Sequence, residues 1–165
     1  MTTFELKGIG RVESALTDVA AAPRQAAILA EEQLALLRKE IDASHCGMLP
    51  ASQFDAMVRV QQARDFSMAG SLLDPGQEHG DGIRVLIAGN YHIRKDLGVP
   101  RYLAHKGVDS TSIAFLEVAP GMFDPQAYLA EAYSEQAFDF VWFTPASSQE
   151  DYCASLRQPA DQSAR

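Results

Sequence analysis

Apolar residues recur at helical spacing in the first half of the chain. Between residues 23 and 43 they fall at i, i+4, i+7 and i+11, which is one face of a helix. These positions are Ala30, Leu34, Leu37 and Ile41. A second stripe follows Pro50 and predicts a helix to about Leu73; its apolar members are Phe54, Met57, Val58, Met68 and Leu72. Two amphipathic helices with a short link predict a helical hairpin over 23–73.

The rhythm changes at Arg84, where short apolar runs bounded by Gly or Pro begin to alternate with short helical segments. The runs predict strands over 84–90, 112–118 and 138–143. Helices are expected over 99–106 and from Pro125 to about Tyr133. Strand–helix–strand–helix–strand predicts parallel strands with right-handed crossovers.

The predicted fold class is therefore α/β, with the N-terminal helical hairpin packed on a small, mostly parallel sheet (βαβαβ). We expect one domain over 1–153, with the βαβαβ unit over 84–145 and a flexible tail over 154–165. Three parallel strands make a thin sheet. Either the hairpin covers one face and leaves an edge for a partner, or the chain is the later part of a larger fold.

Charge and cysteine content narrow the possible functions. The 165 residues carry a net charge of -8, which argues against a general binder of nucleic acid or of anionic membranes. The sequence contains no run of 18 apolar residues, so no transmembrane span is predicted. The N-terminal MTTFELKGIG does not have the pattern of a secretory signal. The chain as written is therefore expected in the cytoplasm. Cys46 and Cys153 form no CxxC motif and are expected to be unpaired thiols.

His92 is the strongest candidate for chemistry, because it follows the predicted strand 84–90. Ligands bind outside the carboxyl ends of strands in open α/β sheets. His92 is a candidate metal ligand, cofactor contact or general base, against the alternative of a histidine bonded to loop backbone. Tyr91 is a candidate ligand of ferric iron or a packed aromatic. Arg94 either holds a carboxylate or is a solvated surface residue.

Two polar residues interrupt the apolar stripe of the second predicted helix. Gln61 and Asp65 lie at i and i+4 between Val58 and Met68, and polar groups on a buried face need partners. We expect Asp65 to point at Arg94 or His92. The contact would then be an ion pair that pins the hairpin to the sheet, or it would orient His92.

Four separated blocks of the sequence resemble a known family. They are SHCGMLP at 44–50, QQARDFSMA at 61–69, VLIAGNYHIRKDLGVPRYL at 85–103, and DFVWFTP at 139–145 with DYC at 151–153. Together they resemble the carboxyl-terminal half of ChaN-type haem-binding lipoproteins of the haem-binding uptake and Tiki superfamily. The resemblance runs from about residue 23 to residue 153. Family members are longer and begin with a lipoprotein signal and an earlier strand.

The resemblance implies an α/β core with a helical lid, haem bound at the interface of a homodimer with a tyrosine as iron ligand, and a non-enzymatic role in haem or iron acquisition. Gly89 to His92 fits the GxxH element of the superfamily, so that His92 would hydrogen-bond the ligand or the iron-bound phenolate. Arg94 would pair with a propionate, and Met68 and Leu72 would form an apolar wall. The residues expected to contact haem are Asp65, Met68, Asn90, Tyr91, His92, Arg94 and Tyr102, with Tyr91 and His92 as metal ligands and Tyr102 in reserve.

Two other functions remain open at this point. One is a metal-dependent hydrolase like some superfamily relatives, although the sequence has no ligand set of fixed spacing. The other is a truncated, non-catalytic remnant that associates with itself. The resemblance also implies a periplasmic or membrane-anchored lipoprotein if the N-terminus is incomplete.

Overall fold

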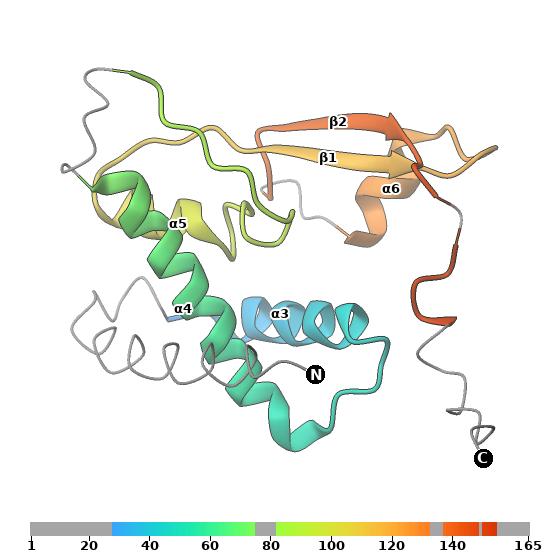
Figure 1. Ribbon diagram of the computed structural model, residues 1–165, viewed down its shortest axis with the longest axis horizontal. Helices are drawn as coiled ribbons and strands as arrows, with labels where there is room; N and C mark the ends of the chain where they lie inside the picture. Colours follow the sequence, from blue (N-terminus) through green and yellow to red (C-terminus); the bar gives the residue numbers. More distant parts are fainter. Residues whose placement is uncertain (1–27, 75–81, 133–136, 149, 155–165) are drawn as a thin grey trace, which may run out of the picture.

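The structure is a computed structural model that describes residues 28–74, 82–132, 137–148 and 150–154. Its elements in chain order are α3 (Glu31–Ser44), the 3-10 helix η1 (Ala51–Gln53), α4 (Phe54–Leu73), α5 (Val99–His105), β1 (Ile113–Val118), α6 (Pro125–Ala132) and β2 (Phe140–Pro145). Figure 1 shows α3 and α4 on one side of the molecule and the strands with α6 on the other. The α/β class with N-terminal helices and a small parallel sheet is confirmed.

The helical hairpin forms from α3 and α4, whose facing stripes bury the expected apolar side chains. Leu37, Ile41 and Val58 form one core cluster with Leu97, which comes from the loop before α5. Farther along α4, Ala69 packs with three side chains of α5, namely Val99, Tyr102 and Leu103. Because α4 contributes to both clusters, it is the element that joins the hairpin to α5. The expected start of the first helix at Pro23 lies outside the described residues.

The sheet is two-stranded and parallel, with Ile113 opposite Phe140 and Phe115 opposite Trp142. Only alternate side chains of β1 face inward, because successive residues of a strand point to opposite faces. Ala114 and Leu116 are buried, whereas Ile113 and Phe115 are exposed. In Figure 1, α6 lies against one side of the strand pair.

The predicted strand over 84–90 is wrong, because this segment is extended but pairs with neither strand. Leu86 packs against the cluster between α4 and α5, and the Arg84 guanidinium donates a hydrogen bond to the carbonyl of Leu72 at the end of α4. These contacts hold the segment to the helices. Its described link to the sheet is a side-chain hydrogen bond from Asn90 Nδ2 to Phe115 O, 3.0 Å long. Within the described residues the sheet therefore has two strands instead of the expected three.

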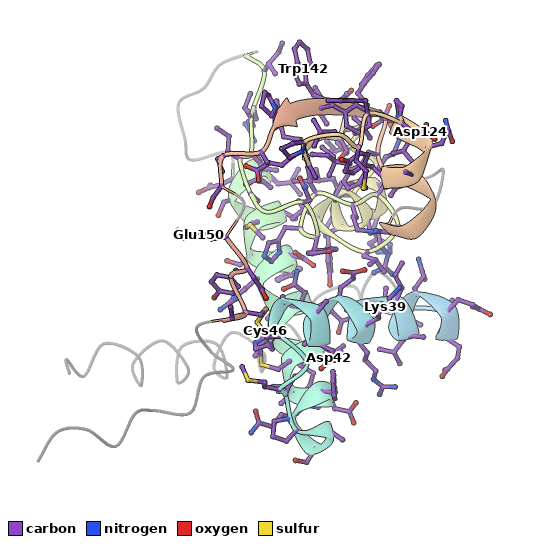
Figure 2. The ribbon with its side chains drawn as sticks, turned by 90° about the vertical axis from the view of Figure 1, so that its right-hand side faces the viewer. Lys39, Asp42, Cys46, Asp124, Trp142 and Glu150 are labelled. Atoms are coloured by element: carbon purple, nitrogen blue, oxygen red, sulfur yellow. A yellow bond between two sulfur atoms is a disulfide. The ribbon has the colours of Figure 1, made fainter. Side chains whose placement is uncertain are left out.

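The expectation of two unpaired thiols is also wrong. Cys46 and Cys153 form a disulfide that joins the turn after α3 to the segment after β2, across 107 positions of sequence. Figure 2 shows Cys46 beside the end of α3, where the segment that carries Glu150 comes down to meet it. The Cα atoms of the two cysteines lie 5.5 Å apart, a distance typical of a disulfide. No local sequence motif predicts this pairing.

Candidate functional site

The candidate site is built on the 91–98 loop. Contacts from α3 and from the segment before β2 hold this loop in place. From α3, Gln33 Nε2 donates to Asp96 O over 2.6 Å. From the segment before β2, Ala137 O accepts from the backbone N–H of Lys95 over 2.8 Å. The Lys95 ammonium also pairs with Asp139. These contacts restrain the loop from both sides, and supporting hydrogen bonds of this kind hold the side chains of a site in position.

His92 lies in this loop against the polar pair of α4. Its Nδ1 is 2.6 Å from Asp65 Oδ1 and 3.0 Å from Gln61 Nε2. The Asp65 side chain is 3% exposed, whereas the His92 ring is 20% exposed. Of the two partners that the sequence suggested for Asp65, the structure selects His92. The same contact joins the hairpin to the loop.

One ring nitrogen cannot donate to Asp65 and accept from Gln61 at once. The contact with Asp65 is shorter and carries charge, so we place the proton on Nδ1 as a donor to that carboxylate. In the neutral imidazole the lone pair then resides on Nε2. Within the described part of the chain Nε2 has no hydrogen bond, so it can accept a proton or bind a metal ion.

Burial dominates the protonation of Asp65. Desolvation raises its pKa from 3.8 to about 6, although His92 and the more distant Arg101 and Arg64 oppose that rise. Near neutral pH the carboxylate is charged and bound to His92. Near pH 6 and below it takes up a proton and weakens as an acceptor for the ring.

Asp65→Asn is expected to stabilise the chain above pH 6. In the wild type, the pKa of Asp65 is higher in the folded chain than in the unfolded chain. The folded state therefore binds more protons between pH 3.8 and about 6, and the contribution of Asp65 to stability falls as pH rises through that window. The free energy of unfolding of the variant should exceed that of the wild type by up to about 3 kcal/mol at pH 8, and the gain should vanish near pH 4.

Urea unfolding across this pH range measures the difference. The exposed Asp109 provides the matched control, since Asp109→Asn removes no buried charge and should give the same small difference at every pH. A gain for Asp65→Asn that does not change between pH 4 and pH 8 would contradict the burial argument.

Arg94 does hold a carboxylate by a two-pronged bond, but that carboxylate is the side chain of Asp96. The side chain of Arg94 is fully buried, and its Nε and Nη2 donate to the two carboxylate oxygens of Asp96 over 2.8 and 2.6 Å. The solvated surface arginine is therefore wrong. The forked pair with Asp96 also occupies the face that a propionate would use, so Arg94 acts as an internal brace of the loop.

The two candidate tyrosines differ in their surroundings. Tyr102 is buried between α4 and α5, its hydroxyl donates to Gln62 O, and burial raises its pKa to about 12. Iron binds the phenolate, so this burial disfavours Tyr102 as an iron ligand, and its reserve role stays a prediction. Tyr91 is half-buried in the same turn as His92 and keeps its place as a candidate.

The two residues expected to form an apolar wall for haem belong to the hydrophobic core. Met68 and Leu72 are partly buried and pack against the cluster of α4 and α5. Asn90 is committed to the carbonyl of Phe115 and thereby anchors the start of the loop beside β1. Met68, Leu72 and Asn90 are therefore held in contacts within the fold and do not form an open surface for a ligand.

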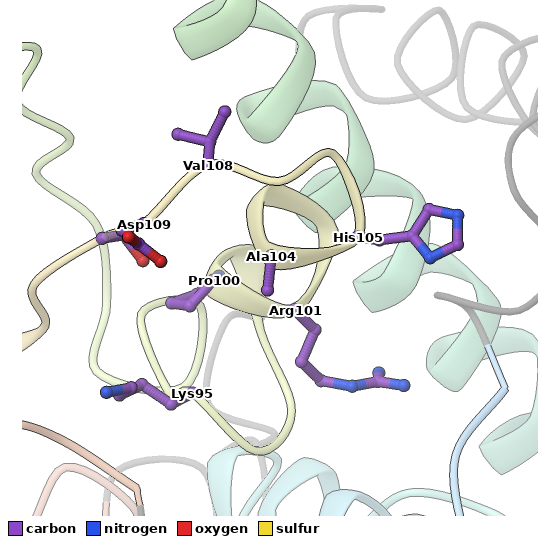
Figure 3. Close-up of a pocket in the computed structure, with 8 residues that line it drawn as sticks. Lys95, Pro100, Arg101, Ala104, His105, Val108 and Asp109 are labelled. Atoms are coloured by element: carbon purple, nitrogen blue, oxygen red, sulfur yellow. The ribbon is translucent and has the colours of Figure 1, made fainter.

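A cavity of about 430 Å³ lies beside α5 and does not include His92. Its charged and polar lining consists of Lys95, Arg101, His105, Asp109 and Ser110. Figure 3 shows Arg101 and His105 extending to one side of Pro100 and Ala104, with Lys95 and Asp109 on the other side. Arg101 also reaches the backbone of Ile28 through Nη2, and burial lowers its pKa. Its charge acts on Asp65, which links the cavity wall electrostatically to the candidate site.

The described residues lack both a cluster of metal-binding side chains and a membrane-spanning helix. No group of three or more His, Cys, Asp or Glu side chains is placed to hold a metal ion there. No helix in the same part of the chain combines the length and the hydropathy that crossing a bilayer requires.

Comparison with known proteins gives one match. The model of a family described as "Haem-binding uptake, Tiki superfamily, ChaN" matches residues 3–103. No curated protein and no solved structure matches significantly. The match begins before the expected residue 23 and ends in α5, before the expected residue 153. It therefore contains Gln61, Asp65 and His92, while β1 and β2 lie beyond it.

Proposed function

This chain belongs to the family described as haem-binding uptake, Tiki superfamily, ChaN, and on that premise we propose that it binds haem through His92 in haem or iron acquisition. The observation that carries the proposal is the buried Asp65 carboxylate 2.6 Å from His92 Nδ1. Histidines that ligate metals almost always donate their second ring N–H to a carboxylate or carbonyl, which fixes the tautomer and raises ligand basicity.

The donor set fits haem iron. A single imidazole nitrogen is the proximal ligand in several classes of haem protein, and it needs no cluster of protein ligands because the porphyrin supplies the other four. When bound, haem would supply an iron centre that His92 Nε2 could hold. Asp65 would hold the proton on Nδ1 and leave the Nε2 lone pair for iron. The adjacent Tyr91 is the candidate for a second contact.

The loop around His92 would supply orientation. Its side chain is one-fifth exposed, and its Nδ1 is held by Asp65 and Gln61 of α4. Arg94 and Asp96 brace the loop from inside, and Gln33 holds it against α3. A ligand nitrogen held in this way loses little conformational freedom on binding, which favours affinity.

The disulfide supports an oxidising compartment for this chain. Structural disulfides persist in secreted, surface and periplasmic proteins and are rare in reducing cytosol. Cys46 and Cys153 join distant parts of one fold, so their bond is structural. We therefore replace the expected cytoplasmic location with a location outside the cytoplasm. A role in haem uptake would require the same location.

Titration with haem tests the proposal. We expect a Soret band to develop and saturate with micromolar haem, and we expect His92→Ala to weaken binding at least about tenfold, with a shifted band. Asp65→Asn should preserve the ring orientation but lower its basicity, and should weaken binding by about 10- to 100-fold.

His105→Ala is the matched control, since His105 is an exposed imidazole at the end of α5, outside the Asp65 pair. It should bind haem as the wild type does. The absence of any Soret change with the wild type, or an equal loss in both histidine variants, would refute the role of His92.

A further inference from the structure

The cavity beside α5 has an apolar floor. Pro100 and Ala104 stand one helical turn apart on α5, and Val108 follows just after that helix. Figure 3 shows Pro100 and Ala104 between the charged residues of the lining. The volume of about 430 Å³ lies within the range of sites that enclose a small molecule, roughly 300 to 1,000 Å³. A floor of this kind favours a ligand with an apolar body over a bare ion.

Three hydrogen-bond donors in the lining have capacity to spare. The ammonium group of Lys95 carries three N–H donors, and among the described residues its one ion pair is with Asp139. Arg101 Nη1 is buried and has no hydrogen-bond partner in the described part of the chain. The half-buried hydroxyl of Ser110 likewise makes no hydrogen bond to any residue that the structure describes. A buried donor without an acceptor costs free energy, so a ligand carboxylate in the cavity would gain charged hydrogen bonds.

The opposite charge is present in the same lining. Asp109 is exposed, and its carboxylate has no hydrogen bond or ion pair within the described ranges. In Figure 3, Asp109 lies on the side of the floor away from Arg101. A carboxylate in this position repels an anion and attracts an ammonium group. The cavity therefore offers separate partners for a negative and a positive group of one ligand.

The balance of charge decides between an anion and a zwitterion. Lys95 already faces Asp139, and the charge of Arg101 already acts on Asp65. With Asp109 in the lining, these groups hold no excess of positive charge, and the whole chain carries a net charge of -8. A free anion would therefore be repelled at longer range. A zwitterion has no net charge, so it avoids this repulsion and can use both kinds of partner.

We propose that this cavity binds a zwitterion with an apolar body, namely a free amino acid with an apolar side chain or a short apolar peptide. Lys95 and Arg101 would hold the carboxylate, Asp109 would hold the ammonium group, and the apolar body would lie on the floor. His92 does not line the cavity, so the inference does not depend on haem binding.

Amide chemical shifts of the isotope-labelled full chain follow binding residue by residue. We expect leucine to shift the amides of Lys95, Ala104 and Ser110 with a dissociation constant on the order of 1 mM or below. Leucinamide lacks the carboxylate and should bind at least about tenfold more weakly. N-acetyl-leucine lacks the ammonium group and should bind at least about threefold more weakly, because that group meets an exposed partner.

The dipeptide leucyl-leucine distinguishes the two sources of this chemistry. Tighter binding of the dipeptide than of leucine assigns the cavity to a peptide, and equal or weaker binding assigns it to a free amino acid. The proposal would be overturned if neither compound shifted the three amides, or if leucine bound no better than its two singly charged analogues.

Asp109→Asn removes the partner of the ammonium group without disturbing the core, since Asp109 is exposed. We expect it to weaken leucine binding about three- to fivefold and to leave the binding of N-acetyl-leucine undiminished. Tighter binding of leucine by this variant would show that the cavity selects an anion, and would overturn the zwitterion.

Ala104→Phe places a ring over the floor and leaves every charged group of the lining in place. It should weaken leucine binding at least about tenfold, because the ring occupies the space of the ligand body. Ala56→Phe is the matched control, since Ala56 is an exposed alanine of α4 that does not line the cavity, and it should bind leucine as the wild type does. Equal binding by the two variants would overturn the proposal. Haem titration of Ala104→Phe separates this inference from the proposed function, because its Soret change should equal that of the wild type.

Discussion

Gly98→Ala is expected to dislodge the 91–98 loop, to lower the free energy of unfolding by about 3 kcal/mol or more, and to abolish the Soret change on haem addition. A Cβ at position 98 would lie 2.1 Å from the carbonyl oxygen of His92 and 2.8 Å from that of Tyr91. Both are backbone atoms, and the His92 carbonyl is bound to the N–H of Val99 over 2.7 Å. The clash therefore cannot be relieved by rotating a side chain.

The cause is close approach and not dihedral strain, since Gly98 has a φ of -99°, which any residue can adopt. Gly70 in α4 makes the matched control, because a Cβ there meets nothing within 4 Å. Gly70→Ala should raise the free energy of unfolding by about 1 kcal/mol through helix propensity. Urea unfolding and haem titration of the two variants measure the contrast. Equal stability of the two variants would contradict the packing of the loop against Gly98.

Loss of the disulfide is expected to have the largest effect on stability. Cys46→Ser with Cys153→Ser releases a loop closed across 107 positions, and the chain-entropy estimate for a loop of this length is about 4 to 5 kcal/mol. Thermal unfolding should show a marked drop in melting temperature for the double variant. Added reductant should lower the wild-type value towards that of the variant and leave the variant itself unchanged.

Thiol counting provides the independent check on this prediction. The purified chain, denatured without reductant, should react with no thiol reagent, and after reduction it should react at two positions. Two reactive thiols before reduction would contradict the pairing. A wild type insensitive to reductant, with no free thiols, would show that the bond forms but does not stabilise the fold.

The helical hairpin could be predicted because each of its two helices has a long series of apolar residues at helical spacing. Such spacing depends only on neighbouring positions in the sequence. The same reasoning failed at 84–90, where the alternation of apolar residues is that of a strand. Pairing depends on whether a neighbouring strand is within reach, and in the structure Leu86 and Arg84 attach the segment to α4 and α5 instead. The disulfide was likewise beyond local reasoning, since the approach of Cys46 to Cys153 results from the whole path of the chain.

The candidate site was predicted in part. Asp65 and Gln61 interrupted an apolar stripe, and that conflict correctly required a partner, which is His92. Arg94 and Asp96 stand two positions apart, close enough to pair, but only the packing around the loop shows that the pair is buried. Tyr102 was predicted only as a haem contact, but it shares the apolar face of α5 with Val99 and Leu103, and that helical spacing is typical of core residues. The role of Gly98 had no local signal, because it arises where two backbone segments touch.

The bond between Cys46 and Cys153 also converts most of the molecule into a covalent ring. Both strands, α4, α5, α6 and the loop that carries His92 lie within that ring, whereas α3 lies outside it. A protease that nicks the chain once anywhere between those cysteines would leave a single molecule, with the cut ends still tethered. In a compartment rich in proteases, such a molecule can survive a nick that would divide an open chain into two fragments.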